Sequence, residues 1–90
     1  PSVSIMSKLK SLGANVDYSD PYVKKFPKMK NYYFDLNSID IDMKSLSNYD
    51  AVILATDHDD FNYELILKHS NILIDCRGKY RGKHKKVFQA

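Results

Sequence analysis

The chain has 90 residues, of which 43% are hydrophobic and 28% are charged, and its formal net charge is +3. This is the composition of an ordinary globular protein of one small domain. The longest apolar run, Ala51–Ala55, is too short to cross a membrane, and the first residues show no signal peptide. The single cysteine, Cys76, excludes an internal disulfide framework and a multi-cysteine zinc site, and it fits a reducing cytosol. The mild positive charge favours an anionic ligand without proving that the ligand is a nucleic acid.

The first part of the chain predicts a helix followed by a strand. Its apolar residues recur at helical spacing, at Ile5, Leu9 and Leu12. Gly13 follows at the position where helices stop. The alternation over Asn15–Ser19 predicts a strand, which Asp20–Pro21 ends because proline cannot extend a paired strand. Residues 24–30 predict a basic surface loop, and the aromatic residues 32–36 predict a short strand.

The middle of the chain predicts a helix, a buried strand and a second helix. A short helix is expected over Ile41–Ser47. Ala51–Ala55 is uniformly apolar, as expected for a parallel strand covered on both faces. The acidic segment Asp57–Asp60 offers N-cap residues for the next helix. That helix is expected to carry Phe61, Leu65 and Lys68 along one face.

The last part predicts one more buried strand over Asn71–Asp75, then a basic segment over residues 77–86 and a final apolar pair, Val87–Phe88. Alternating helices and strands indicate an α/β fold with a mostly parallel sheet. Repeats, low-complexity tracts and linkers are absent from the sequence, so a single Rossmann-like domain with three layers is expected over residues 1–90.

Open α/β sheets bind ligands beyond the carboxyl ends of their strands. Three segments follow predicted strands, namely residues 19–22, 56–58 and 75–78. Arg77 is the strong anion-binding group among them, because a guanidinium can hold a phosphate in a bidentate way. Gly78 beside it allows a close approach of the backbone. The glycines are Gly13, Gly78 and Gly82, so neither G-x-G-x-x-G nor a P-loop is present.

Each candidate residue also has an ordinary structural explanation. Arg77 is either a phosphate ligand or a solvated surface arginine. Cys76 is either a nucleophile or a small buried hydrophobic residue, which is the usual role of a lone cysteine. His58, among aspartates, fits a metal site or a general base, but also a polar strand-to-helix turn that caps the helix. The basic segment with Tyr80 either stacks on RNA bases or forms solvated surface.

Three segments in a consistent order carry a resemblance over nearly the whole chain. They are Tyr18–Val23 with Phe26–Pro27, Tyr49–His58 with Phe61 and Tyr63, and Ile74–Arg77 with Tyr80–Gly82. They resemble the patterns Y-x-D-P-Y-V…F-P, Y-D-A-V-V-I-A-T-D-H-x-x-F-x-Y and V-D-T-R-N-x-Y-R-G in the C-terminal, UDP-binding domain of the UDP-glucose/GDP-mannose dehydrogenase family. The T-D-H-x-x-F-x-Y form looks most like the branch of UDP-N-acetylglucosamine 6-dehydrogenase.

The resemblance implies an NAD-dependent enzyme that oxidises the C6 alcohol of a UDP-sugar to a carboxylate through a thiohemiacetal on a cysteine. It places the parent enzyme in the cytoplasm, as a homo-oligomer, in the synthesis of capsule or related surface polysaccharides. Arg77 matches the family's arginine that contacts the nucleotide-sugar substrate. Cys76 stands where relatives carry Thr or Gly, so no catalytic, cofactor-binding or metal residue is assigned, and the 90 residues alone are expected to be inactive.

The resemblance also implies a partial domain. Pro1 matches the proline that opens the domain's first helix, so the family's first strand, with a substrate-contacting lysine, is expected upstream of Pro1. We expect another chain or preceding residues to fill that gap. The expected partner is a UDP-sugar, with neither nucleic acid nor a membrane. The alternative is a small α/β binding module that uses its basic segment to bind nucleic acid or acidic partners.

Overall fold

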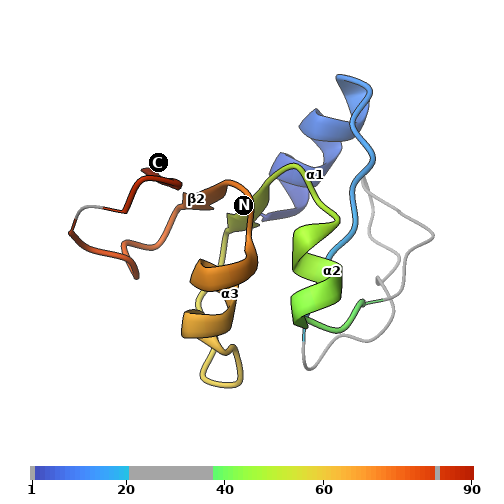
Figure 1. Cartoon of the computed structure of the whole chain (residues 1–90). Coiled ribbons are helices and arrows are strands. Elements are labelled where there is room, and N and C mark those ends of the chain that lie inside the picture. Colours follow the sequence, from blue (N-terminus) through green and yellow to red (C-terminus); the bar gives the residue numbers. More distant parts are fainter. Residues whose placement is uncertain (1, 21–37, 83) are drawn as a thin grey trace. The chain divides into compact units, whose positions relative to one another are not determined.

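The computed structural model describes residues 2–20, 38–82 and 84–90 (Figure 1). The chain divides into two compact units, Pro1–Asp40 and Ile41–Ala90, and each is described by itself. The loop predicted over residues 24–30 and the strand predicted over residues 32–36 lie outside the described residues.

The described part of the first unit contains one helix, α1, over Ser2–Ser11, which confirms the predicted helix. It ends at Gly13, whose φ of 92° lies in the left-handed region that glycine adopts without strain. The Gly13 N–H donates to the Lys10 carbonyl at 3.0 Å, and the Ala14 N–H donates to the Leu9 carbonyl at 3.0 Å. This pair of bonds is a Schellman motif, so the glycine ends the helix as its position in the sequence predicts.

The strand predicted over Asn15–Ser19 is wrong, because the described part of the first unit contains no strand. The Tyr18 carbonyl accepts a hydrogen bond from the Ile39 N–H at 2.9 Å. The next contacts use side chains: the Asp20 N–H donates to Ser38 Oγ at 2.8 Å, and Ser19 Oγ donates to the Ile39 carbonyl at 2.7 Å. Serine hydroxyls therefore make hydrogen bonds that backbone groups would make in a β-sheet. For this reason the alternating side chains of this segment do not form a strand.

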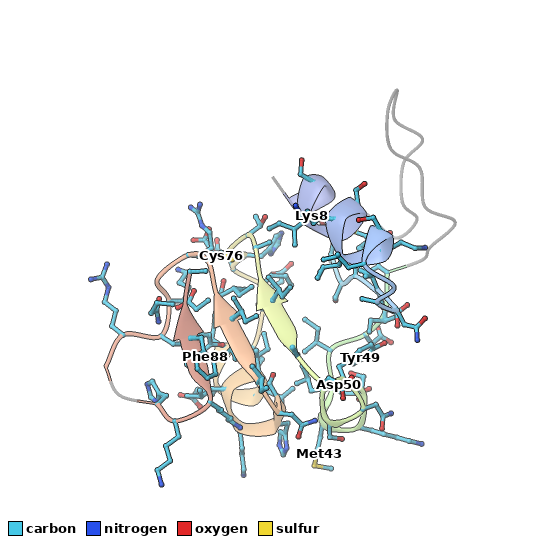
Figure 2. The ribbon with its side chains drawn as sticks, turned by 90° about the horizontal axis from the view of Figure 1, so that it is seen from above. Lys8, Met43, Tyr49, Asp50, Cys76 and Phe88 are labelled. Carbon is cyan, nitrogen blue, oxygen red and sulfur yellow. The ribbon has the colours of Figure 1, made fainter. Side chains whose placement is uncertain are left out.

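The second unit is built on a parallel sheet of three strands, β1 (Val52–Leu54), β2 (Leu73–Asp75) and β3 (Val87–Gln89), in the order β1-β2-β3. The structure therefore confirms an α/β fold with an open, all-parallel sheet. The predicted strands at 51–55 and 71–75 are confirmed at shorter length. Figure 2 shows the strands side by side, with Cys76 at one end of the sheet and Tyr49 and Asp50 at the other.

The third strand, β3, was not predicted, and only Val87–Phe88 was identified as apolar. Parallel neighbours usually require a crossover helix. Residues 76–86 connect β2 to β3 without a helix among the described residues, so the alternation of helices and strands gave no signal for β3. Phe88 pairs with Ile74 in register but remains 56% exposed. A strand that is this exposed needs no long apolar run, so the sequence lacks the pattern typical of a buried strand.

Two helices accompany the sheet, α2 (Met43–Ser47) and α3 (Tyr63–His69). The Asp42 carboxylate caps α2 by accepting from the Ser45 N–H at 2.7 Å. The predicted cap of α3 within Asp57–Asp60 is wrong, because Asn62 performs this role and accepts from the Leu65 N–H at 3.1 Å. Phe61 consequently precedes the helix, and the side chain of α3 that is buried is Ile66.

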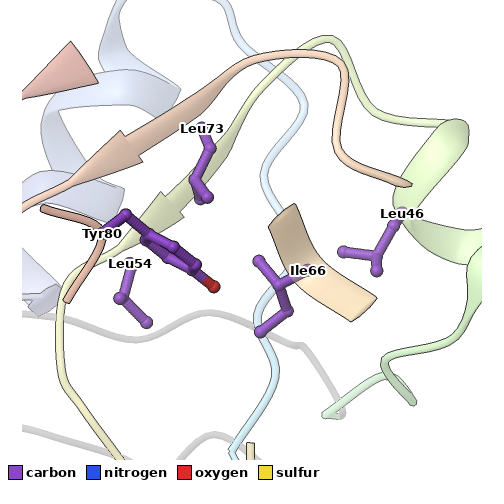
Figure 3. Close-up of a cluster of buried hydrophobic side chains, with 5 residues drawn as sticks. All are labelled: Leu46, Leu54, Ile66, Leu73 and Tyr80. Carbon is purple, nitrogen blue, oxygen red and sulfur yellow. The ribbon is translucent and has the colours of Figure 1, made fainter. Parts of the chain in front are cut away.

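The core of the second unit gathers side chains from both helices, two strands and the connection between β2 and β3 (Figure 3). Its buried members are Leu46, Leu54, Ile66, Leu73 and Tyr80. Burying an aliphatic side chain of this size contributes about 1.5–3 kcal/mol relative to leaving it exposed. Tyr80 belongs to the connection itself, so a buried ring anchors this irregular segment against the sheet.

Candidate functional site

The candidate site begins with a buried carboxylate, Asp75, the last residue of β2. The residue is 0% exposed, and its Oδ1 and Oδ2 accept from the N–H groups of Arg77 at 2.9 Å and Tyr80 at 2.8 Å. Burial raises the pKa of Asp75, but hydrogen bonds from the Tyr80, Arg77 and Lys79 backbones and from the Gln89 side chain more than offset it. The pKa therefore lies below its ordinary value of 3.8, and Asp75 holds the following loop as a carboxylate.

Two cationic side chains leave this loop and contact one exposed carboxylate. Arg77 Nε lies 3.3 Å from Asp57 Oδ1, and Lys79 Nζ lies 3.3 Å from Asp57 Oδ2. Their side chains are 52% and 41% exposed, and that of Asp57 is 39% exposed. The hydrogen bond from Lys79 is the largest cause that lowers the pKa of Asp57, followed by its own backbone N–H and the charges of Lys79 and Arg77. We call Asp57, Arg77 and Lys79 the cation cluster.

Gly78 makes this arrangement possible. Its φ of 70° lies in the left-handed region, where a side chain with a Cβ is strained. Gly78 therefore provides the backbone conformation between Arg77 and Lys79 without strain.

Two tyrosines, Tyr63 and Tyr80, lie next to the cation cluster. The Tyr80 hydroxyl donates to the Tyr63 carbonyl at 2.7 Å, and the Tyr63 hydroxyl accepts from the His58 N–H at 2.8 Å. Lys79 Nζ lies 5.4 Å from the centre of the Tyr63 ring, within the range of a cation–π interaction. Burial, with the nearby Tyr63 and Asp75, raises the pKa of Tyr80 to about 12, so its hydroxyl remains a donor at neutral pH.

The structure brings together two of the three strand-end segments that the sequence singled out. Residues 56–58 and 75–78 meet through the ion pair between Asp57 and Arg77. Residues 19–22 belong to the first unit, where Asn15–Ser19 is not a strand, and Tyr22 lies outside the described residues. The sequence-based prediction missed Lys79 and the role of Asp57. Lys79 follows Arg77 by two residues after a buried strand, and this spacing was the available signal.

His58 forms part of a local turn. Its Nδ1 accepts from the Asp60 N–H at 3.1 Å, and its carbonyl accepts from the Phe61 N–H at 3.1 Å. Among the described residues, no group of three or more His, Cys, Asp or Glu side chains could hold a metal ion. The hydrogen bonds of His58 therefore agree with a polar strand-to-helix turn, although the residue that caps the helix is Asn62.

A pocket of about 380 Å³ lies where the loop after β2 meets the end of β3. It is lined by Gly78, Tyr80, Arg81, Gly82 and Gln89. The Gln89 side chain crosses to the loop and donates to the Tyr80 carbonyl at 2.8 Å. This open hollow at the carboxyl end of the sheet shares Gly78 with the loop that carries Arg77 and Lys79.

A small parallel sheet with cationic side chains beyond its carboxyl ends defines a Rossmann-like α/β domain suited to an anionic ligand. The family model described as UDP-glucose/GDP-mannose dehydrogenase family, UDP binding domain, matches residues 1–82, and the chain belongs to this family. No curated protein and no solved structure matches the chain significantly. The family resemblance of the sequence is confirmed, and the chain carries the UDP-binding domain of a nucleotide-sugar dehydrogenase.

The family's dehydrogenases use NAD in general, but the residues of this chain do not fit a dinucleotide cradle. Such a cradle needs closely spaced glycines at a strand-to-helix turn. Gly78 and Gly82 lie on the connection between β2 and β3, and Gly13 ends a helix. No step through NAD is therefore assigned to these residues. Among the described residues, no helix is long and apolar enough to span a membrane.

Proposed function

We propose that the chain supplies the UDP-binding part of an NAD-dependent dehydrogenase that oxidises the C6 alcohol of a UDP-hexose or UDP-N-acetylhexosamine to a carboxylate. The T-D-H-x-x-F-x-Y form at Thr56–Tyr63 favours the UDP-N-acetylhexosamine branch. In this proposal residues 1–90 form a partial C-terminal domain, and NAD binds to a separate domain of the parent enzyme. The parent enzyme is a cytoplasmic homo-oligomer that serves the synthesis of capsule or a related surface polysaccharide.

The observation that carries this proposal is the position of Arg77. Its backbone is fixed by the buried Asp75, while its side chain reaches into solvent beyond the carboxyl end of β2. A guanidinium held in this way presents planar, paired donors to a phosphate oxygen pair. Its role is to bind and orient the diphosphate of the UDP-sugar so that the sugar is held for chemistry elsewhere in the enzyme. The residues of this chain supply no catalytic group in this proposal.

The test is titration calorimetry of the wild-type chain and its variants with UDP. Arg77→Ala is expected to weaken binding by about ten- to a hundredfold, since a charge-assisted hydrogen bond contributes roughly 1.5–3 kcal/mol. Arg77→Lys keeps the charge but loses the planar pair of donors, so it is expected to restore only part of the affinity. Lys44→Ala removes an exposed positive charge from α2 and is the control. Equal UDP affinity in the wild type and Arg77→Ala would contradict the assignment of Arg77.

No structural observation favours the alternative, in which the basic segment binds nucleic acid. Arg77 and Lys79 of that segment contact Asp57, and Lys86 Nζ donates to the Lys68 carbonyl at 2.8 Å. These cations are therefore partly engaged within the second unit. A steep loss of RNA affinity with rising salt would be the signature of that alternative.

A further inference from the structure

We infer that Lys79 is a second diphosphate-binding residue, which together with Arg77 makes the site selective for a nucleoside diphosphate over a monophosphate. The inference rests on the proposed function of Arg77 and extends it to a residue that neither the family match nor the resemblance assigns. Three features of the described residues support it.

The first feature is the shared anion. Arg77 Nε and Lys79 Nζ each lie 3.3 Å from a different oxygen of the same carboxylate, Asp57. The two cations can therefore reach one anionic group from two sides in the conformation that the loop already has. A diphosphate carries anionic oxygens on two phosphorus atoms, so it can give each cation a phosphate of its own. A monophosphate offers one phosphate for both.

The second feature is the support of the two side chains. Lys79 Nζ lies over the ring of Tyr63. The Tyr63 hydroxyl accepts from the His58 N–H, and the Tyr63 backbone carbonyl accepts from the Tyr80 hydroxyl, so the position of the ring is fixed. The backbone N–H groups of Arg77 and Tyr80 donate to the two carboxylate oxygens of Asp75, and these bonds hold the loop between them. Ordering long cationic side chains costs conformational entropy, and a site that partly orders them in advance loses less on binding.

The third feature is the balance of charge. One carboxylate faces two cations, so the cation cluster has a net charge of +1 and remains attractive to an anion. All three side chains are between 39% and 52% exposed, so a ligand can reach them. Exposed ion pairs of this kind are weak. The contacts to Asp57 therefore can be exchanged for contacts to a phosphate at little cost.

The test compares UDP and UMP as ligands of the full chain by titration calorimetry at one fixed, low ionic strength. Lys79→Met removes the ammonium group and keeps most of the aliphatic stem. It is expected to weaken UDP binding by about tenfold and UMP binding much less, so that the ratio of UDP to UMP affinity falls. Lys44→Met, on the exposed surface of α2, is the matched control and is expected to change neither ligand's affinity by more than about twofold.

The outcomes separate this inference from the proposed function. Weaker UDP binding in Arg77→Ala, together with equal UDP-to-UMP ratios in Lys79→Met and Lys44→Met, would overturn the role of Lys79 and leave that of Arg77. Equal UDP affinity in the wild type, Arg77→Ala and Lys79→Met would overturn both. Circular dichroism of Lys79→Met is expected to match the wild type, because the replaced group is exposed. Lys79→Arg keeps the positive charge, so it is expected to bind UDP more tightly than Lys79→Met and less tightly than the wild type.

Discussion

Two aspartates lie at the carboxyl ends of neighbouring strands and are held in opposite ways. Asp75 is fully buried, and its oxygens accept hydrogen bonds from the backbone of the loop after β2. Asp57 is exposed and contacts the side chains of Arg77 and Lys79. The buried carboxylate fixes the backbone, and the exposed one balances charge. Stability should therefore respond mainly to the loss of Asp75, and ligand affinity mainly to changes at Asp57, Arg77 and Lys79.

The largest expected effect is the loss of stability in Asp75→Asn. The amide nitrogen takes the place of one acceptor oxygen, so a donor then faces the N–H of either Arg77 or Tyr80 inside the core. A buried hydrogen-bonding group without a partner costs about 1–3 kcal/mol, and more where a charged partner is removed. We expect the free energy of unfolding to fall by about 3 kcal/mol in urea titrations.

Asp59→Asn is the control for this variant, since Asp59 is exposed and the same charge is lost. Equal stability of Asp75→Asn and Asp59→Asn would remove the distinction between the two kinds of carboxylate. A variant of Asp75 that does not fold at all agrees with the expectation at its extreme.

The pH dependence of stability provides the next largest effect. The pKa of Asp75 in the folded chain lies below its ordinary value of 3.8. The ionised carboxylate therefore contributes its full stability above pH 3.8, and this contribution is lost as the pH falls through the lower folded pKa. Unfolding free energies of the wild type and Asp75→Asn should converge on acidification below 3.8. A constant difference down to the acid limit would contradict the assigned pKa direction.

The sequence predicted β1 and β2 because each segment contains an uninterrupted apolar run, Ala51–Ala55 and Ile72–Ile74. The predicted segments 51–55 and 71–75 contain β1 and β2, and the alternation of helices and strands along the chain indicated the parallel sheet. The third strand could not be predicted in this way, because Phe88 is half exposed and a loop precedes it in place of a helix. At Asn15–Ser19 the alternating pattern predicted a strand that the structure does not contain. Serine side chains there take the place of backbone hydrogen bonds between strands.

The site was predicted only where it depends on topology. Arg77 was proposed as a ligand-binding residue because it follows a buried strand, and ligands of open α/β sheets bind at that edge. The buried carboxylate of Asp75 and the pairing of Lys79 with Asp57 depend on how the loop turns at Gly78. The periodicity of apolar residues does not indicate such a turn, so these contacts could not be predicted from the sequence.

A smaller effect is expected for Tyr80→Phe, which keeps the buried ring and removes the hydroxyl that donates to the Tyr63 carbonyl. The expected loss is about 1 kcal/mol of unfolding free energy. Because the pKa of Tyr80 is raised from 10.0 to about 12, its contribution is complete below pH 10.0 and is lost as the pH rises through about 12. Ultraviolet titration of the phenols should lose the step near 12 in this variant. Loss of a step near 10.0 instead would show that the Tyr80 phenol is solvated.

The smallest expected effect is on stability in Asp57→Asn. Exposed ion pairs contribute little in water, so the midpoint of thermal unfolding should equal that of the wild type within error. Its affinity for UDP should rise by about threefold at low salt, because the negative charge of Asp57 no longer repels the diphosphate. The gain should shrink as salt screens the cluster. Asp59→Asn is again the matched control. Weaker UDP binding in Asp57→Asn would mean that this carboxylate orients Arg77 and Lys79, and the exposed aspartate would then resemble the buried one in function.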